Sequence, residues 1–219
     1  MDEIRYTLLS DGLSDKTLMN IIDWLFNDLV PNMPVQPQFA DLTRLPDPPR
    51  ADRIDLRISK AIEYYPCDII FVHRDAERTD KETYEIRRGE IQENFDKIVV
   101  DDSKLVKIIP VRMMETWLLI DIEAIKIASG NRNGKENLKL PAINQLENHS
   151  TPKETLHDLI KQASGLKGRR LDKLNVGHAI HLVAENISDY NILRRLNAFK
   201  TFEKEVKNVL MELGAIQEN

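Results

Sequence analysis

The sequence lacks the features of several large protein classes. It contains one cysteine, Cys67, so no intrachain disulfide can form, which is typical of proteins that fold in a reducing compartment. No stretch approaches the roughly 20 consecutive apolar residues that a membrane-spanning helix needs. The opening residues, MDEIRYTLLSDG, have neither the apolar region nor the small-residue cleavage site of a secretory signal. We therefore expect a cytoplasmic protein that makes no contact with a membrane.

Motifs of common nucleotide-binding and hydrolytic enzymes are also absent. There is no Gly-x-x-x-x-Gly-Lys-Ser/Thr loop, no Gly-x-Gly-x-x-Gly fingerprint and no Gly-x-Ser-x-Gly elbow. His157, His178 and His181 lack the spacing of known zinc sites. The net charge of −5 excludes a generally basic nucleic-acid-binding protein. Contact with nucleic acid would need a local basic patch or bound metal ions.

Apolar segments alternate with segments of helical periodicity along the first part of the chain. Hydrophobic residues make up 42% of the 219 residues, which is enough for a sizeable core. Pro37 interrupts the second apolar run, so that run is expected to be an edge strand or no strand at all. The alternation predicts an α/β fold with a mostly parallel four-stranded sheet flanked by helices. The expected strands are residues 5–10, 35–43, 67–72 and 105–111; the expected helices begin at Ser14, Ile54, Lys81 and near Glu115.

The C-terminal part reads as helical. Residues 129–150 are polar and rich in Asn and Gly, and three helical segments follow at 151–164, 169–185 and 190–213. We divide the chain into an α/β core, residues 1–130, and a helical extension packed on it, residues 131–219. The helices could form a lid over the crevice of the sheet or a separate docking surface, and the sequence leaves both open.

Acidic residues follow the predicted strands at the point where each strand ends. Asp11 closes the first strand, Asp75 and Glu77 follow the third, and Glu115 follows the fourth. Ligands of parallel sheets bind beyond the carboxyl ends of the strands. We expect Asp11, Asp75 and Glu77 to converge there on Mg²⁺ or Mn²⁺, ions that prefer oxygen ligands. The alternative is that Asp11 caps a turn and that the other acids lie in a solvated loop.

The spacing of these acids resembles a known domain. The TOPRIM domain of topoisomerases, primases and related nucleases has a glutamate-glycine motif and a later Asp-x-Asp motif. This chain resembles the first motif in Asp11-Gly12, which is followed by Asp15, and the second in Asp75-Ala76-Glu77. Asp11 stands where that domain has glutamate, and Glu77 stands where it has the second aspartate. The segment PVRMMETWLLID, residues 110–121, resembles a bacterial TOPRIM-like family of unknown function that is related to the overcoming-lysogenization-defect nucleases.

This resemblance covers residues 5–128 and implies a TOPRIM-like sheet, catalytic roles for Asp11, Asp75 and Glu77, and Glu115 as a further metal ligand. Trp117 in the same segment is expected to be a core residue. Several basic residues are candidates for contact with phosphate, although His73 could be structural, Arg74 could pair with an acid, and the cluster at 167–170 could be a solvated loop. These candidates are Lys16, His73, Arg74, Arg112, Arg169 and Arg170.

Two functions from different classes remain open. The first is a metal-dependent phosphodiester hydrolase, with nucleic acid as the substrate that the resemblance implies. The second is a non-catalytic TOPRIM-like module in a multi-component bacterial defence or mobile-element system, with a partner protein such as an ATPase. Asp11 and Glu77 differ from the residues of the TOPRIM motifs, and this difference favours the non-catalytic module. Phosphoryl transfer on a small molecule is a third option, and the oligomeric state is open, with a homodimer among the alternatives.

Overall fold

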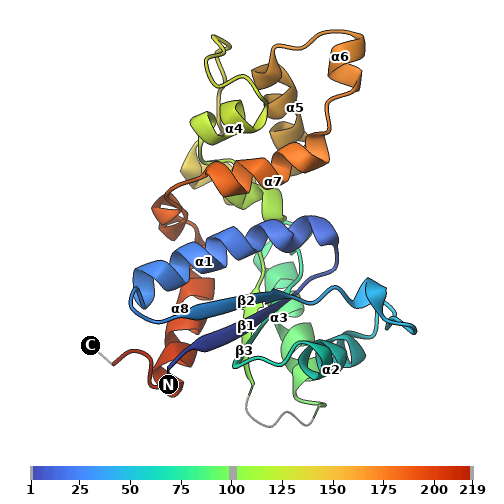
Figure 1. Cartoon of the computed structure of the whole chain (residues 1–219), viewed down its shortest axis with the longest axis vertical. Coiled ribbons are helices and arrows are strands. Elements are labelled where there is room, and N and C mark those ends of the chain that lie inside the picture. Colours follow the sequence, from blue (N-terminus) through green and yellow to red (C-terminus); the bar gives the residue numbers. More distant parts are fainter. Residues whose placement is uncertain (1, 99–102, 218–219) are drawn as a thin grey trace.

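Four parallel strands form the centre of the molecule. The computed structural model describes residues 2–98 and 103–217 (Figure 1). The strands are β1 (Ile4–Leu9), β2 (Val35–Phe39), β3 (Ile69–His73) and β4 (Lys104–Ile108), in the order β2-β1-β3-β4. All three neighbouring pairs run parallel. The predicted α/β fold with a four-stranded parallel sheet flanked by helices is therefore confirmed.

The burial of each strand follows from its composition. Every residue of β3 is buried, as expected for an uninterrupted apolar run that helices cover on both faces. The outer strand β2 is only partly buried and pairs on one side, with β1. Its Pro37 has no backbone N–H to donate to a further strand, so the expected edge position of this segment is confirmed.

Eight α-helices connect or follow the strands within the described residues, with five short 3₁₀ helices between them. None of the helices there is both long enough and apolar enough to cross a bilayer. The α-helices are α1 (Leu18–Leu29), α2 (Ile54–Tyr64), α3 (Lys81–Phe95), α4 (Ile122–Ala128), α5 (Pro152–Ser164), α6 (Arg169–Asp172), α7 (Val176–Asn186) and α8 (Asn197–Glu212). The 3₁₀ helices are η1 (Leu13–Thr17), η2 (Leu42–Arg44), η3 (Met114–Leu118), η4 (Ile143–Asn148) and η5 (Asn191–Arg195).

Two expected helices are interrupted. The helix expected from Ser14 begins as η1, and its α-helical part starts at Leu18. The helix expected to carry Glu115 through Ile125 is divided at Asp121, whose extended backbone and side chain cap α4 by accepting hydrogen bonds from Glu123 N and Ala124 N. Glu115 and Trp117 therefore lie in η3. The end of the third expected helix, Val99, lies outside the described residues.

The last third of the chain occupies two places in the molecule. In Figure 1, α8 lies beside the sheet, whereas α5, α6 and α7 lie with α4 on the far side of α1. The contact of α8 with the sheet is aromatic: the ring of Phe202 lies 6.1 Å from Phe71 of β3 and 5.8 Å from Trp117. The helical extension is thus packed in part directly on the sheet, while the proposed division at residue 130 stays a prediction.

Candidate functional site

Three segments meet at the carboxyl end of the sheet. β1 and β3 are neighbours and end side by side, since Leu9 pairs with Val72 in the register. The segment after β4 is joined to the segment after β3 by two backbone hydrogen bonds, from Ala76 N to Pro110 O at 3.3 Å and from Glu77 N to Arg112 O at 2.8 Å. The residues that follow β1, β3 and β4 therefore share one region, as the parallel topology requires.

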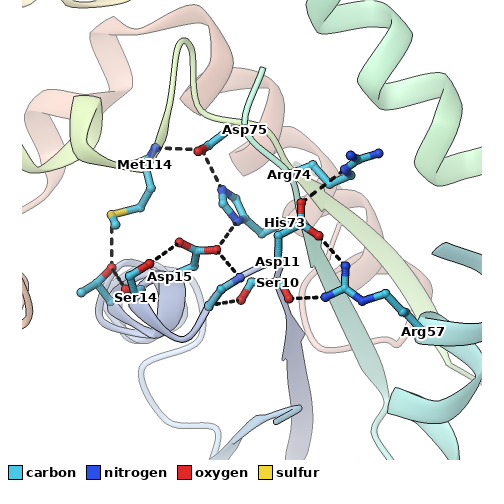
Figure 2. Close-up of polar contacts among 11 residues, drawn as sticks. Ser10, Asp11, Ser14, Asp15, Arg57, His73, Arg74, Asp75 and Met114 are labelled. Atoms are coloured by element: carbon cyan, nitrogen blue, oxygen red, sulfur yellow. Dashed lines mark hydrogen bonds and ion pairs between the residues drawn. The ribbon is translucent and has the colours of Figure 1, made fainter. Parts of the chain in front are cut away.

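The centre of this region is His73, which is buried between two carboxylates (Figure 2). Its Nε2 lies 3.2 Å from Asp75 Oδ1, within hydrogen-bond distance. Its Nδ1 lies 3.3 Å from Asp15 Oδ2 in an ion-pair contact. Burial acts to lower the pKa of His73, but Asp15 and Asp75 together outweigh burial and raise the pKa to about 9. At neutral pH the ring is consequently an imidazolium that holds both carboxylates in place.

Asp15 and Asp75 are each fixed by further hydrogen bonds. Asp75 Oδ1 accepts from Met114 N at 2.9 Å, which links the segment after β3 to η3. Asp15 Oδ2 accepts from Gly12 N at 3.1 Å. Burial acts to raise the pKa of Asp15, but the His73 contacts and the Gly12 and Ser14 hydrogen bonds lower it overall. Asp15 belongs to the motif that begins at Asp11 but was not among the predicted site residues, and its place four residues after Asp11 was the available signal.

Glu115 is a third acid of this region. Its side chain is buried in η3, next to Met114, whose backbone N–H holds Asp75. Burial raises the pKa of Glu115, and the negative charges of Asp75 and Asp15 add to that increase, while Lys153 opposes it. Glu115 is therefore a carboxyl group that can take up and release a proton closer to neutral pH than an exposed glutamate can.

Asp11 and Glu77, in contrast, are engaged by arginines. Asp11 forms an ion pair with Arg57 of α2 and lies 3.5 Å from the Nε of Arg74 (Figure 2). The exposed Glu77 pairs with Arg87 of α3 at 2.9 Å, and its backbone adopts a φ of +64°. The three expected metal ligands Asp11, Asp75 and Glu77 thus each have a different partner. The physical reason is that Arg57 of α2 and Arg87 of α3 compete for two of them.

The arginines form a continuous network along this edge. Arg74 and Arg87 both contact Glu90 of α3, at 2.8 Å and 2.9 Å. Arg57 also donates to the carbonyl oxygen of Ser10 at 2.6 Å. Arg74 was expected either to contact phosphate or to pair with an acid, and here it pairs with Asp11. The sequence did not single out Arg57, since nothing in its local pattern distinguishes it from other exposed helical arginines.

The other candidates for phosphate contact lie in different surroundings. Lys16 is exposed on η1. Arg112 follows β4 and donates from Nη1 to the carbonyl oxygen of Ser150. Arg169 and Arg170 are exposed on α6, which Figure 1 places at the opposite end of the molecule from the sheet. Lys16, His73, Arg74 and Arg112 therefore all lie at or after the carboxyl ends of strands, near Asp75, whereas Arg169 and Arg170 do not.

The donor groups fit a divalent ion only in a limited way. Within residues 2–98 and 103–217, no three side chains of His, Cys, Asp or Glu are grouped to hold a metal ion. Mg²⁺, however, commonly binds through one or two carboxylates, with water and substrate phosphate completing its shell. The Asp75 side chain is 36% exposed, and its contacts with His73 and with Met114 N are made by Oδ1. Asp75 and Glu115 therefore suit an ion of this type, and a preformed three-ligand site does not exist here.

His73 gives the site a measurable pH signature. Its folded pKa of about 9 lies above the unfolded value near 6.5. Protonated His73 therefore stabilises the folded state fully below about pH 6.5, and this stabilisation disappears as the pH rises through about 9. Its contribution to the free energy of unfolding is on the order of 3 kcal/mol. We expect the free energy of unfolding of wild type to exceed that of His73→Gln most at pH 6 and least at pH 10, measured by urea unfolding in chelator. A difference that is constant over this range would contradict the assignment.

Comparison with known proteins gives a family but no activity. A family model described as a domain of unknown function (DUF4276) matches residues 8–207. No curated protein and no solved structure matches the chain. Because the match extends over most of the 219 residues, the chain belongs to the DUF4276 family, a family of unknown function.

Proposed function

We propose that this chain is a divalent-metal-dependent phosphodiester hydrolase of TOPRIM-like type, with Asp75 and Glu115 as its metal carboxylates. The observation that carries the proposal is the buried His73 held between Asp15 and Asp75 at the carboxyl end of a parallel sheet. Burying several charges costs free energy that packing of apolar residues would not cost. Such arrangements are concentrated at functional sites, where fixed carboxylates and shifted pKa values are needed.

Each residue of the site has a separate role in the proposed reaction. A bound Mg²⁺ or Mn²⁺ supplies stabilisation of the negative charge on the phosphoryl oxygens. His73 and Met114 N hold Asp75 Oδ1, which would leave the other carboxylate oxygen to hold the ion. His73 is thus a positioning residue. Glu115 would take a proton from the water whose oxygen forms the new bond to phosphorus, and a solvent water would donate a proton to the ester oxygen as its bond to phosphorus breaks.

The arginines supply the contacts to phosphate. Arg74 contacts Asp11 through Nε and Glu90 through Nη1, which leaves Nη2 to face a phosphate oxygen. In this arrangement Asp11 positions Arg57 and Arg74, whereas the exposed Glu77 pairs with Arg87 at the surface of the molecule. The net charge of −5 makes such local cations necessary for any polyanionic substrate.

A hydrolysis assay tests the proposal. Purified protein is incubated with plasmid, single-stranded DNA and bis(p-nitrophenyl) phosphate in Mg²⁺, in Mn²⁺ and in chelator. We expect hydrolysis that needs the metal, a melting temperature that rises with metal, and loss of activity in Glu115→Gln. Glu93→Gln, which changes an exposed glutamate of α3, is the matched control. Absence of hydrolysis with every substrate and of any metal effect on melting would overturn the proposal.

The non-catalytic interaction module remains the second candidate. It is favoured by the ion pairs of Asp11 and Glu77 with arginines, which occupy two acids that the TOPRIM resemblance assigns to catalysis. The same assay separates the two functions: metal that raises the melting temperature without any cleavage supports a metal held for structure. For this second function we propose a defence or mobile-element system with a partner such as an ATPase. A homodimer is a further proposal.

Glu77 distinguishes our placement of the site from the one that the TOPRIM motif implies. Its side chain is 67% exposed and pairs with Arg87 at the surface. We expect Glu77→Gln to change the free energy of unfolding by less than about 1 kcal/mol and to keep hydrolytic activity within about a factor of three of wild type. The measurements are urea unfolding and the bis(p-nitrophenyl) phosphate assay with metal. Loss of activity as complete as that of Glu115→Gln would return Glu77 to the metal site.

A further inference from the structure

A cavity opens beside the candidate site. It has a volume of about 490 Å³ and lies between the first turns of α3 and α8 and the 3₁₀ helix η4. Tyr84 of α3, Val111 after β4 and three asparagines of η4 and α8 line it: Asn144, Asn148 and Asn197. The volume is within the roughly 300–1,000 Å³ of typical small-molecule sites.

The cavity shares a wall with the region around Asp75. Val111 lies between Pro110 and Arg112, whose carbonyl oxygens accept hydrogen bonds from Ala76 N and Glu77 N. Thr79, two residues after Glu77, also lines the cavity. A ligand that reaches from the cavity past Val111 therefore arrives at the segment that carries Asp75. The cavity and the candidate site therefore share the segment that follows β4.

Three amide side chains line the cavity, beside Lys81 and the acids Asp80, Glu85 and Glu147. The side chains of Asn144, Asn148 and Asn197 make no hydrogen bond within residues 2–98 and 103–217, and each offers both donors and an acceptor. All three acids of the lining have partners: Asp80 accepts from Thr83 N at 2.7 Å, Glu147 accepts from Ala198 N at 2.7 Å, and Glu85 lies 3.7 Å from Arg88 Nε. The asparagine amides are consequently the neutral groups of the cavity that are free to form hydrogen bonds with a ligand, while Lys81 and three acids add charge to its wall.

Tyr84 adds a flat aromatic surface. The guanidinium of Arg88 lies 5.9 Å from the centre of its ring and covers it from one side, and the ring is only partly buried. Bases stack on such rings, and asparagine amides match the paired donors and acceptors on the edge of a base. Amides around one aromatic ring, next to a site for phosphate chemistry, suit a nucleobase better than an anion or an aliphatic ligand.

We propose that this cavity binds the nucleoside part of the phosphoester substrate. The inference deepens the proposed function, since it makes the substrate a nucleotide or a nucleic acid strand whose phosphate lies near Asp75. It rests on the proposed function for the phosphate chemistry alone. Binding of the base needs neither the metal nor Asp75, so it can be measured separately.

Titration by NMR tests the inference. The ¹⁵N-labelled full chain, in chelator, is titrated with adenosine, guanosine, cytidine and uridine, and with glucose as a non-nucleoside ligand. We expect saturable shifts of the side-chain amide signals of the three asparagines with at least one nucleoside. Tyr84→Leu should weaken that binding by about tenfold or more, and Tyr84→Phe, which keeps the ring, should bind about as wild type does. Titration with the matching nucleoside monophosphate and with a single-stranded oligonucleotide then separates free nucleotide from strand.

Matched variants and a separate measurement of folding make the test specific to the cavity. Asn148→Ala should weaken nucleoside binding, whereas Asn133→Ala, at an exposed asparagine outside the cavity, should not. Each variant is compared at equal folded fraction by its melting temperature. Absence of saturable shifts with all four nucleosides, or shifts with glucose alone, overturns the inference even if bis(p-nitrophenyl) phosphate is hydrolysed. Nucleoside binding without any hydrolysis overturns the proposed function and leaves the cavity assignment standing.

Discussion

Replacing Asp75 with asparagine should lower metal-dependent phosphodiester hydrolysis by more than about a hundredfold while the chain stays folded. Asparagine has the same shape and keeps an oxygen that can accept from Met114 N, so the link between the segment after β3 and η3 survives. What is lost is the negative charge that a metal ion needs and one of the two charges that hold the His73 imidazolium. The effect should therefore be larger in activity than in stability, where part of the contribution of the His73 ion pairs is lost.

The comparison variant for this experiment is Asp47→Asn, which removes a charge from an exposed loop position. Values of kcat/KM for bis(p-nitrophenyl) phosphate and rates of plasmid cleavage are measured for both variants at saturating Mg²⁺ and Mn²⁺. Asp47→Asn should match wild type. If Asp75→Asn retains activity within about a factor of three of wild type, Asp75 is not a metal ligand and the site must lie elsewhere.

Replacing Trp117 with alanine should cost about 3–5 kcal/mol of unfolding free energy, one of the largest losses that a single substitution in this chain can cause. Trp117 is fully buried in η3, and its ring lies 5.3 Å from Phe199 and 5.8 Å from Phe202. Phe202 in turn contacts Phe71 of β3. The indole therefore joins η3 to α8 and through it to the sheet, and its removal opens a cavity at that junction.

Trp117→Phe is the informative control, because it separates the ring from the indole N–H. The Nε1 of Trp117 is buried without a hydrogen-bond partner in the described part of the chain, so phenylalanine keeps an aromatic ring and removes a poorly satisfied donor. We expect Trp117→Phe to lower the free energy of unfolding much less than Trp117→Ala does. The alanine variant should lower the melting temperature by about 10 °C. Thermal unfolding followed by circular dichroism gives both values. Equal losses would show that the ring itself contributes little.

Local patterns were sufficient for much of the fold. The uninterrupted apolar run that became β3, and Pro37 in β2, predicted a covered central strand and an edge strand, and the structure has both. Trp117 was expected to be a core residue and is fully buried. The break at Asp121 was missed, because a helix-capping side chain and a solvated helical acid look alike until the backbone around them is known.

The candidate site shows what the sequence determined by itself and what only the tertiary structure decided. Parallel topology follows from the order of apolar runs and helices, and it determines that acids after β1, β3 and β4 come to one end of the sheet. Which acids face each other depends on partners from other elements. Arg57 of α2 and Arg87 of α3 bind Asp11 and Glu77, while His73 joins Asp15 to Asp75. Ion pairs depend on distance and burial, and these arise only when the helices are packed on the sheet.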